Sequence, residues 1–221
     1  MTTSKIDKNK VFINAIIRLT QLELREFRKY TFEIESKFES EKNRLADSYE
    51  DAIKDVHPDD RRDIAEIISE EHYMIEEIYL GIYRKSTLVS IYSYLENSLN
   101  NLCRRLYKKQ KYPIKYTDLR GKGIERAKNY LKKLNKVDFD PLNTEWSHLN
   151  ALNKIRNCIV HSEGDIKYYG NREEINTLAE HNPHLSIKDD RYLKVSRKYV
   201  DNCITTTEEF LVKLYHQVFS K

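Results

Sequence analysis

The chain has 221 residues, of which 33% are charged, and its 39 Lys and Arg against 35 Asp and Glu give a net charge of only +4. Five glycines and four prolines are too few for the tight turns of a sandwich, a barrel or a doubly wound sheet, so the composition favours long helices. No apolar run reaches the roughly 18 residues of a membrane span, and the first residues lack the apolar core of a signal peptide.

Three cysteines, Cys103, Cys158 and Cys203, lie far apart in the chain and form no CxxC pair. An odd number of scattered cysteines is typical of reduced, buried thiols, and we interpret the protein as cytoplasmic. No Cys and His spacing matches a zinc site. We therefore expect neither a metal ion nor a cofactor.

Apolar residues at helical spacing predict three long helices in the first half of the chain, over about 8–55, from 58 to the low 80s, and over 84–109. Pro58 is placed to open the second helix, and Gly81 to loosen its junction with the third. The third helix has the most regular apolar stripe, which indicates a seam against neighbouring helices. The inner faces expected for the second and third helices are Ile64, Ile67, Ile68, Met74, Ile75, Ile78 and Tyr79, and Leu88, Ile91, Leu95, Leu99, Leu102 and Leu106.

Shorter elements are expected in the second half. A loop at Pro113 precedes a basic helix over about 123–135, and a further helix follows over about 144–161. Residues 164–195 are less regular and contain no predicted helix. Two apolar runs within them predict a small hairpin, at 185–187 and 192–195.

A last helix is expected from Ser196, as its N-cap, to Phe219. Together the elements predict an all-α helical bundle with a long N-terminal helical extension and one small β-hairpin. We expect the extension to comprise residues 1–83 and the helical domain residues 84–221, with one continuous domain over 1–221 as the alternative.

Charge is unevenly distributed along the chain. Residues 39–80 hold 14 acidic and 5 basic residues, a net charge of −9, whereas residues 104–136 hold 13 basic and 2 acidic residues, a net charge of +11. Tyrosines alternate with the bases of the second stretch, at positions 107, 112, 116 and 130, as in surfaces that bind phosphates and unstacked bases. A solvated helix face is the alternative. The candidate RNA-binding residues are Arg104, Arg105, Lys108, Lys109, Lys132 and Lys133.

The segment most suggestive of chemistry is Asn153–Gly164, at the end of a predicted amphipathic helix. Asn157 and His161 are four residues apart and share a face, and the ring of His161 can swing towards Arg156 because the helix ends nearby. An Arg, an Asn and a His supply a fixed cation, an orienting amide and a group of a type that titrates near neutral pH, which suits phosphodiester cleavage without a metal ion. The spacing alone also fits a helix end at which His161 interacts with the helix dipole.

The stretch from Ala151 to His161 resembles the Arg-x4–6-His signature of the HEPN superfamily, in which a polar residue such as Asn commonly follows the Arg. The upstream stretch 89–102 is similar to the family helix that packs against the motif helix. That family helix often carries an acidic residue near the site, and Glu96 is its counterpart here. The resemblance covers roughly residues 84–220, which makes this part a HEPN-like helical domain.

The resemblance implies a homodimer in which the two motifs meet in a cleft between protomers. It implies a metal-independent endoribonuclease, of a kind often found as a toxin or antiviral defence effector, that cuts RNA by 2′-hydroxyl attack. His161 would be the general acid or base, Arg156 would stabilise the transition state, Asn157 would position it, and Glu96 would support the site. An antitoxin or defence-system protein is a further implied partner. In some relatives the antitoxin modifies a Tyr two residues past the motif His, and because this chain has Glu163 there, the resemblance does not extend to that modification.

Two other functions are compatible with the sequence. Residues 104–136 of a catalytically inactive helical module of the same fold would bind RNA or a partner protein. Alternatively, residues 8–55 would form the core of a structural or coiled-coil adaptor.

Overall fold

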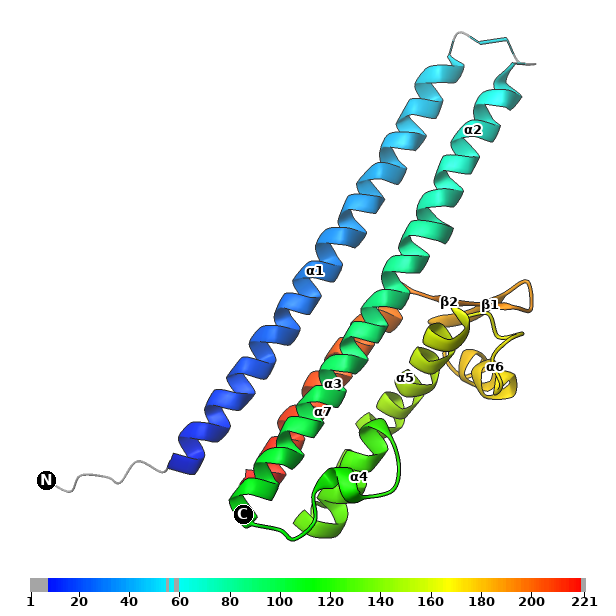
Figure 1. Ribbon diagram of the computed structural model, residues 1–221. Coiled ribbons are helices and arrows are strands. Elements are labelled where there is room, and N and C mark those ends of the chain that lie inside the picture. Colours follow the sequence, from blue (N-terminus) through cyan, green and yellow to red (C-terminus); the bar gives the residue numbers. More distant parts are fainter. Residues whose placement is uncertain (1–7, 55, 58–59, 220–221) are drawn as a thin grey trace, which may run out of the picture.

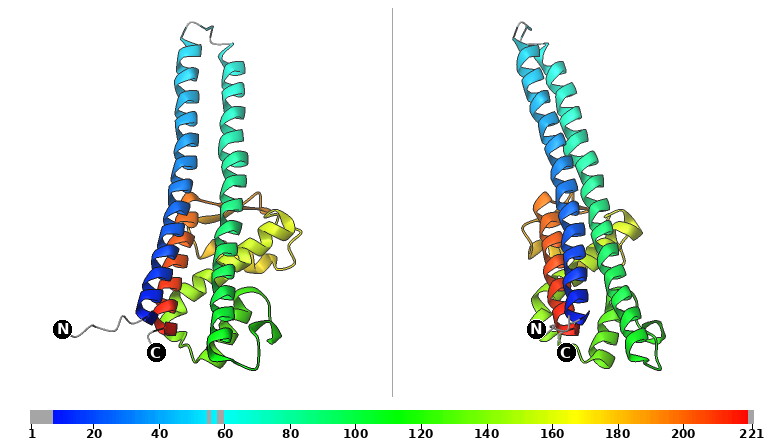
Figure 2. Two further views of the ribbon diagram at one scale, coloured as in Figure 1. Left: turned by 60° about the vertical axis from the view of Figure 1, so that its left-hand side comes forward. Right: turned by 90° about the vertical axis from the view of Figure 1, so that its left-hand side faces the viewer.

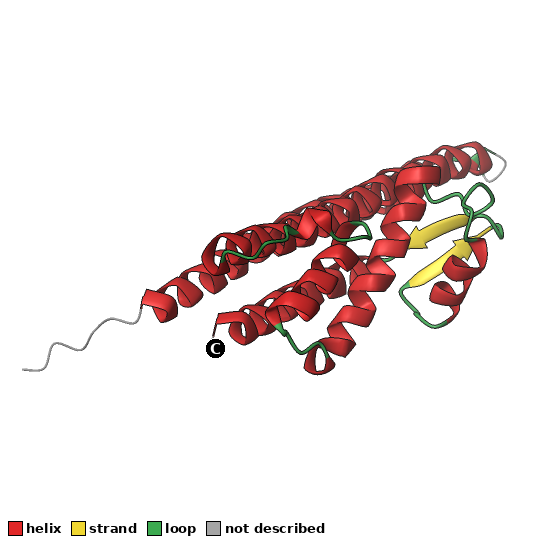
Figure 3. Cartoon of the chain, turned by 60° about the horizontal axis from the view of Figure 1, so that its bottom comes forward, coloured by secondary structure: helices red, strands yellow, loops and turns green. Residues whose placement is uncertain are grey.

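The computed structural model describes residues 8–54, 56–57 and 60–219 of the chain. Pro58, which is expected to open the second helix, lies outside them. The described residues form an all-α helical bundle with one small antiparallel hairpin (Figures 1 and 3). Its elements are α1 (Lys8–Ile53), α2 (Arg61–Tyr73), the π-helical η1 (Met74–Tyr79), α3 (Leu80–Gln110), η2 (Tyr116–Asp118), α4 (Gly123–Asn135), η3 (Asp140–Leu142), α5 (Asn143–Ser162), α6 (Arg172–Glu180), β1 (Leu185–Lys188), β2 (Tyr192–Val195) and α7 (Arg197–Phe219).

The second and third predicted helices are one continuous rod, in which α2, η1 and α3 follow without a break (Figure 1). The expectation that Gly81 loosens this junction is wrong. A single glycine weakens a helix by only about 1 kcal/mol relative to alanine, and tertiary contacts on both sides of the junction outweigh that effect. The only irregularity in the rod is the π-helical turn of η1, which inserts a wider turn just before Gly81.

The main core lies between α3, α4, α5 and α7, and the first half of α1 packs along α7. Phe12 meets Phe219 edge to face at 5.3 Å between ring centroids, and Phe27 meets Tyr94 at 6.1 Å. The predicted stripe of α3 is confirmed, because all of its members are buried: Leu88, Ile91, Leu95, Leu99, Leu102 and Leu106. Trp146 of α5 lies in the same core, at 5.6 Å from both Phe139 and Phe210.

Beyond this bundle, the second half of α1 and the rod of α2 and η1 form a projecting two-helix arm (Figure 2). A small second core, with Leu45 and Ile75 among its members, joins the two helices. The expected inner face of the second helix is only partly correct, because Ile67, Met74 and Tyr79 are exposed. A helix with a single neighbour buries only a narrow stripe of its surface, so a broad apolar face cannot be covered in the arm.

The remaining elements pack beside α3 and α5. The hairpin is confirmed, with Leu185 opposite Val195 at its open end. Ser196 caps α7 as predicted, since its Oγ accepts a hydrogen bond from the backbone N–H of Tyr199 at 3.2 Å. Helix α6 is missing from the prediction, and it lies within the segment expected to be irregular. It has nine residues, fewer than the roughly 11–18 over which a helical period is recognised, and it buries only Ile175.

Candidate active site

The motif helix α5 ends in a tight cap that fixes the position of its last turn. The N–H of Glu163 donates to the carbonyl of Ile159 at 2.8 Å, and the N–H of Gly164 donates to that of Cys158 at 3.3 Å. Glu163 adopts the left-handed conformation with φ of 56°, and Gly164 has φ of 84°. These bonds form a Schellman cap, which confirms the helix end expected near Gly164.

One side of α5 is buried and the other is accessible to solvent. Leu152, Ile155 and Cys158 point into the core. The accessible face carries residues spaced at three and four along the helix, with Asn153, Arg156 and Asn157 half-buried and Val160 and His161 exposed. We call this set the α5 face.

Arg156 is held in place by two neighbours. Its Nη1 donates a hydrogen bond to Oδ1 of Asn157 at 3.0 Å, and its guanidinium carbon lies 5.3 Å from the centroid of the Tyr92 ring on α3. The Nε atom of Arg156 is buried without a hydrogen-bond partner. Asn157 in turn donates to Asn153 at 3.5 Å. The structure therefore brings Arg156 and Asn157 together and, among the described residues, leaves the buried Nε–H of Arg156 without an acceptor.

Glu96 reaches the same cluster through Tyr92. Tyr92 is only 3% exposed, and burial, reinforced by the nearby Glu96, raises the pKa of its hydroxyl. The start of α4 packs onto both residues. A Cβ atom added at Gly123, which has φ of 54°, would lie 2.8 Å from Oη of Tyr92 and 3.6 Å from Oε1 of Glu96. Glu96 and Arg156 thus flank one tyrosine.

His161 lies at the other end of the α5 face, on the lining of a pocket of about 760 Å³. The pocket is bounded by α5, by the loop after it, by the rod and by the hairpin; its other charged and aromatic lining residues include Tyr73, Lys85, Tyr168, Lys188, Tyr192 and Lys194. His161 is five positions beyond Arg156, roughly 7.5 Å along the helix axis. In the part of the chain that the structure describes, no hydrogen bond or ion pair joins His161 to Arg156 or Asn157.

The candidate RNA-binding residues form a separate basic end of the bundle, at the last turns of α3 and α4. Arg104 bonds Asn101 at 3.0 Å, and Arg105 lies 3.3 Å over the ring of Phe12. All six side chains are accessible: Arg104, Arg105, Lys108, Lys109, Lys132 and Lys133. Lys108 is 16 residues beyond Tyr92 on α3, roughly 24 Å along the axis.

The tyrosines of this basic stretch do not form the expected stacking surface. Tyr116 and Tyr130 are buried and meet edge to face at 6.3 Å. The hydroxyl of Tyr112 donates to the carbonyl of Leu134 at 2.9 Å, which ties the end of α3 to α4. These rings belong to the packing between the helices, because apolar contact area decides the position of a tyrosine more often than its spacing among charges.

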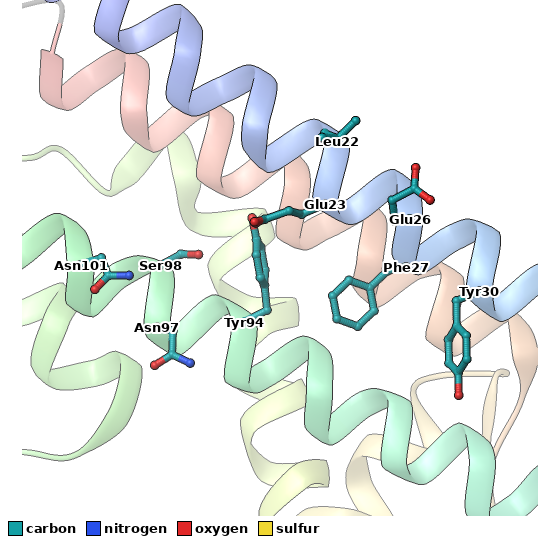
Figure 4. A pocket seen from close by; sticks show the side chains of 9 residues that line it. All are labelled: Leu22, Glu23, Glu26, Phe27, Tyr30, Tyr94, Asn97, Ser98 and Asn101. Carbon is teal, nitrogen blue, oxygen red and sulfur yellow. The ribbon is translucent and has the colours of Figure 1, made fainter.

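A second large pocket, between α1 and α3, has a different character. It is lined by Glu23, Glu26, Phe27, Tyr30, Tyr94 and neighbouring polar residues, and Figure 4 shows Tyr94 projecting from α3 towards Glu23 of α1. Burial raises the pKa of the Tyr94 hydroxyl. The lining carries two carboxylates and no Lys or Arg, so it does not suit an anionic ligand. The pocket beside His161 contains three lysines together with the carboxylates of Glu163, Asp165 and Asp189.

Sequence reasoning missed Tyr92 and Lys85. Both lie on α3, seven residues apart and therefore on one face, and Glu96 continues that face. Lys85 donates to the carbonyl of Glu163 at 2.9 Å, directly after the motif helix. The spacing of residues 85, 92 and 96 shows in the sequence that they share one face of α3. The sequence does not show that this face lies against α5.

Comparison with known proteins gave no match to a family model, to a curated protein or to a solved structure. Within the described ranges, no group of three or more His, Cys, Asp or Glu side chains is arranged to hold a metal ion. Over the same residues, every helix falls short of the length and apolar character needed to cross a membrane.

Proposed function

We propose that the protein is a metal-independent endoribonuclease of the HEPN type. The observation that supports this most directly is the α5 face, on which a fixed guanidinium and an exposed imidazole lie on one accessible side of a rigidly capped helix. The Arg and the His of the Arg-x4-His motif thus lie on the same accessible side of the helix. A buried motif would have removed the basis for the proposal.

The chemistry follows from the roles of these groups. The 2′-hydroxyl of a ribose loses its proton and its oxygen bonds to phosphorus, while the bond to the 5′-oxygen breaks and that oxygen gains a proton. The products are a 2′,3′-cyclic phosphate and a 5′-hydroxyl. The imidazole of His161 transfers protons. Arg156, oriented by Asn157 and Tyr92, neutralises charge that develops on the phosphoryl oxygens through its remaining Nη N–H groups. Glu96 supports this arrangement across Tyr92.

The active unit in this proposal is a homodimer. Val160, between Arg156 and His161 on the α5 face, is 48% exposed, and Ile82, three residues before Lys85 on the rod, is exposed as well. A two-fold interface over this face would remove both apolar side chains from water. The same interface would bring two copies of Arg156 and His161 into one cleft. The distance between Arg156 of one protomer and His161 of the other would then be shorter than within one protomer.

RNA would be held mainly by charge at the basic end formed by α3 and α4. The cellular role in this proposal is that of a toxin or a phage-defence effector, with an antitoxin or defence-system protein as partner. The unequal charges of the acidic arm and the basic end provide two chemically different surfaces for such partners.

The direct test is cleavage of a panel of tRNA, rRNA and mRNA by the purified protein in EDTA, with the RNA ends mapped chemically. We expect His161→Ala and Arg156→Ala each to lower the rate on the order of 10² to 10⁴-fold. His148→Ala, an exposed histidine on the same helix, and Arg197→Ala, an exposed arginine on α7, are the matched controls and retain the activity. Intact RNA with wild-type dimer, or equal rates in His161→Ala, would refute the proposal.

A second candidate is a catalytically inactive RNA- or protein-binding module. The observation that favours it is the position of Arg156, which is half-buried against Tyr92 and makes no bond to His161. A structural arginine would be placed in the same way. In that case charge reversal at Lys108, Lys109, Lys132 and Lys133 abolishes binding, no RNA is cut, and His161→Ala changes nothing.

A further inference from the structure

The pocket beside His161 contains one cation without a carboxylate partner. Lys188 and Lys194 both pair with Glu77, which lies between them. Lys85 instead donates to the backbone carbonyl of Glu163 at 2.9 Å, and no ion pair joins it to a carboxylate within the described residues. Among the described residues, no hydrogen-bond acceptor is found for the other two ammonium N–H groups of Lys85.

The surroundings of Lys85 are shaped to keep this charge in place. Gly164 leaves room for it, because a Cβ atom there would lie 3.0 Å from the Lys85 Nζ. Burial, and secondarily the nearby Lys194, lowers the pKa of Lys85. An anion that accepts the unused N–H groups would offset that effect, since it stabilises the charged form.

Aromatic rings line the same pocket as the lysines. Tyr168, in the turn after α5, is 71% exposed, and the guanidinium of Arg191 lies 5.6 Å from its ring centroid. Arg191 also lies 4.8 Å from the ring of Tyr192 and donates to Oδ2 of Asp165 at 2.8 Å. Since Asp165 holds Arg191, the cation that flanks both rings is fixed before any ligand arrives.

The loop that carries Tyr168 is itself anchored to the hairpin. The N–H of Ile166 donates to the carbonyl of Arg191 at 2.9 Å, and the N–H of Leu193 donates to the carbonyl of Gly164 at 2.9 Å. A ring that is exposed on an anchored loop gains little from folding but offers a face on which a base can stack.

We propose that this pocket binds a single nucleotide of the RNA next to the scissile bond, with its phosphate on Lys85 and its base stacked on Tyr168. This rests on the proposed function, for which it defines the substrate contact nearest to His161. The volume of about 760 Å³ lies within the range of small-molecule sites. Glu163, Asp165 and Asp189 also line the pocket, and Asp165 is paired with Arg191. The carboxylates of Glu163 and Asp189 disfavour a second phosphate, so a nucleoside triphosphate fits poorly.

The test uses an uncleavable probe, a 2′-O-methyl RNA trinucleotide, titrated into the full-length protein and followed by NMR. The probe is too short to bridge to the basic end, because Lys108 lies 23 residues beyond Lys85, roughly 35 Å along the rod. We expect Lys85→Met and Tyr168→Ala each to weaken binding about 10-fold or more, as base stacking and a phosphate contact predict. Lys85→Arg and Tyr168→Phe keep the charge and the ring, and so retain most of the affinity.

Two exposed residues elsewhere serve as controls: Lys198→Met on α7 and Tyr30→Ala on α1 leave the affinity unchanged. Equal affinity in wild type, Lys85→Met and Tyr168→Ala would overturn the nucleotide subsite, even if RNA cleavage depends on His161. If instead the trinucleotide binds as predicted but no RNA is cut, the subsite stands and the nuclease proposal fails. Tyr168 is exposed, so its variants remain informative if Lys85→Met fails to fold.

Discussion

The guanidinium of Arg156 makes a cation–π contact with the ring of Tyr92, which joins the motif helix α5 to the long rod that contains α3. Tyr92 also receives the backbone N–H of Ile124 at the start of α4 and lies beside Glu96. One buried tyrosine therefore connects three helices and sets the orientation of the motif arginine. Its substitution separates the contributions of the ring and of the hydroxyl.

Tyr92→Phe keeps the ring beneath Arg156 and removes only the hydroxyl contact to α4. We expect a loss of stability of about 1 kcal/mol and near-normal RNA cleavage. Tyr92→Leu also removes the cation–π contact, and we expect RNA cleavage to fall at least 10-fold because Arg156 loses its orientation. Urea denaturation and cleavage rates measure the two effects. Equal activity in both variants would show that the cation–π contact with Tyr92 does not position Arg156.

Gly123 is predicted to tolerate no side chain. Gly123→Ala would place a Cβ atom 2.8 Å from the Tyr92 hydroxyl at a φ of 54°, and we expect it to lower the free energy of unfolding by about 1–3 kcal/mol. The double variant with Tyr92→Phe removes the clash but not the backbone strain, so it recovers part of the loss. Gly170→Ala, with no atom near its added Cβ, is the neutral control. Chemical denaturation of the four proteins provides the measurement.

Glu77 is predicted to stabilise the fold at neutral pH and not in acid. The hydrogen bond from Lys194, reinforced by Lys188, lowers the pKa of this carboxyl below its usual value of 4.5. A lowered folded-state pKa adds stability above the unfolded-state value, and this stability disappears as the pH falls through the folded-state value. Glu77→Gln should therefore cost up to about 1 kcal/mol at pH 7 and progressively less below pH 4.5. Thermal melts of both proteins across pH 3–7 test this. A constant difference would contradict it.

The three cysteines are buried and unpaired, as predicted. Burial raises the pKa of Cys103 and of Cys203 to about 12 and also raises that of Cys158. A thiol reacts as its thiolate, so we expect native protein at pH 8 to react with a thiol reagent far more slowly than protein in guanidinium, where all three react. Fast labelling of native Cys158 would show that the last turns of α5 open readily.

The buried pair of Arg84 and Glu35 joins the rod to α1 at the root of the arm. Arg84 donates from Nε and Nη2 to the two carboxylate oxygens at 2.7 and 2.8 Å, and Glu76 lies 3.4 Å away as a second partner. We expect Glu35→Gln to cost about 2–4 kcal/mol, because it leaves a charge only partly compensated in a dry site. Replacing both residues, as in Glu35→Leu with Arg84→Met, costs less than Glu35→Gln alone. Denaturation of the single and double variants measures this.

The sequence predicted the long elements well, for identifiable reasons. Helix α1, the stripe of α3 and the cap of α7 at Ser196 carry strong local patterns, and the hairpin has two apolar runs with a polar turn between them. The prediction lacks helix α6 because its nine residues are fewer than the roughly 11–18 over which a helical period is recognised. The inner face of α2 was overestimated because periodicity shows which residues are apolar and not how many neighbours will cover them.

Only the part of the candidate site that lies on α5 was predictable from the sequence. The spacing of Arg156, Asn157 and His161 correctly places them on one accessible side of α5. What they touch depends on how α3 is aligned against α5, which no local pattern encodes. For that reason Tyr92 and Lys85 were missed, and the rings of Tyr116 and Tyr130, expected at the surface, are packed between helices.

The unbroken course of α2, η1 and α3 has a mechanical consequence. The same rod that forms one side of the arm also carries Lys85, Tyr92 and Glu96 further along its length. A partner that binds the arm therefore contacts one end of a continuous helical rod, and the other end of this rod supports the motif helix. Torque applied far from α5 is delivered to the contacts beneath Arg156, and the widened turn of η1 is where such a rod would bend first.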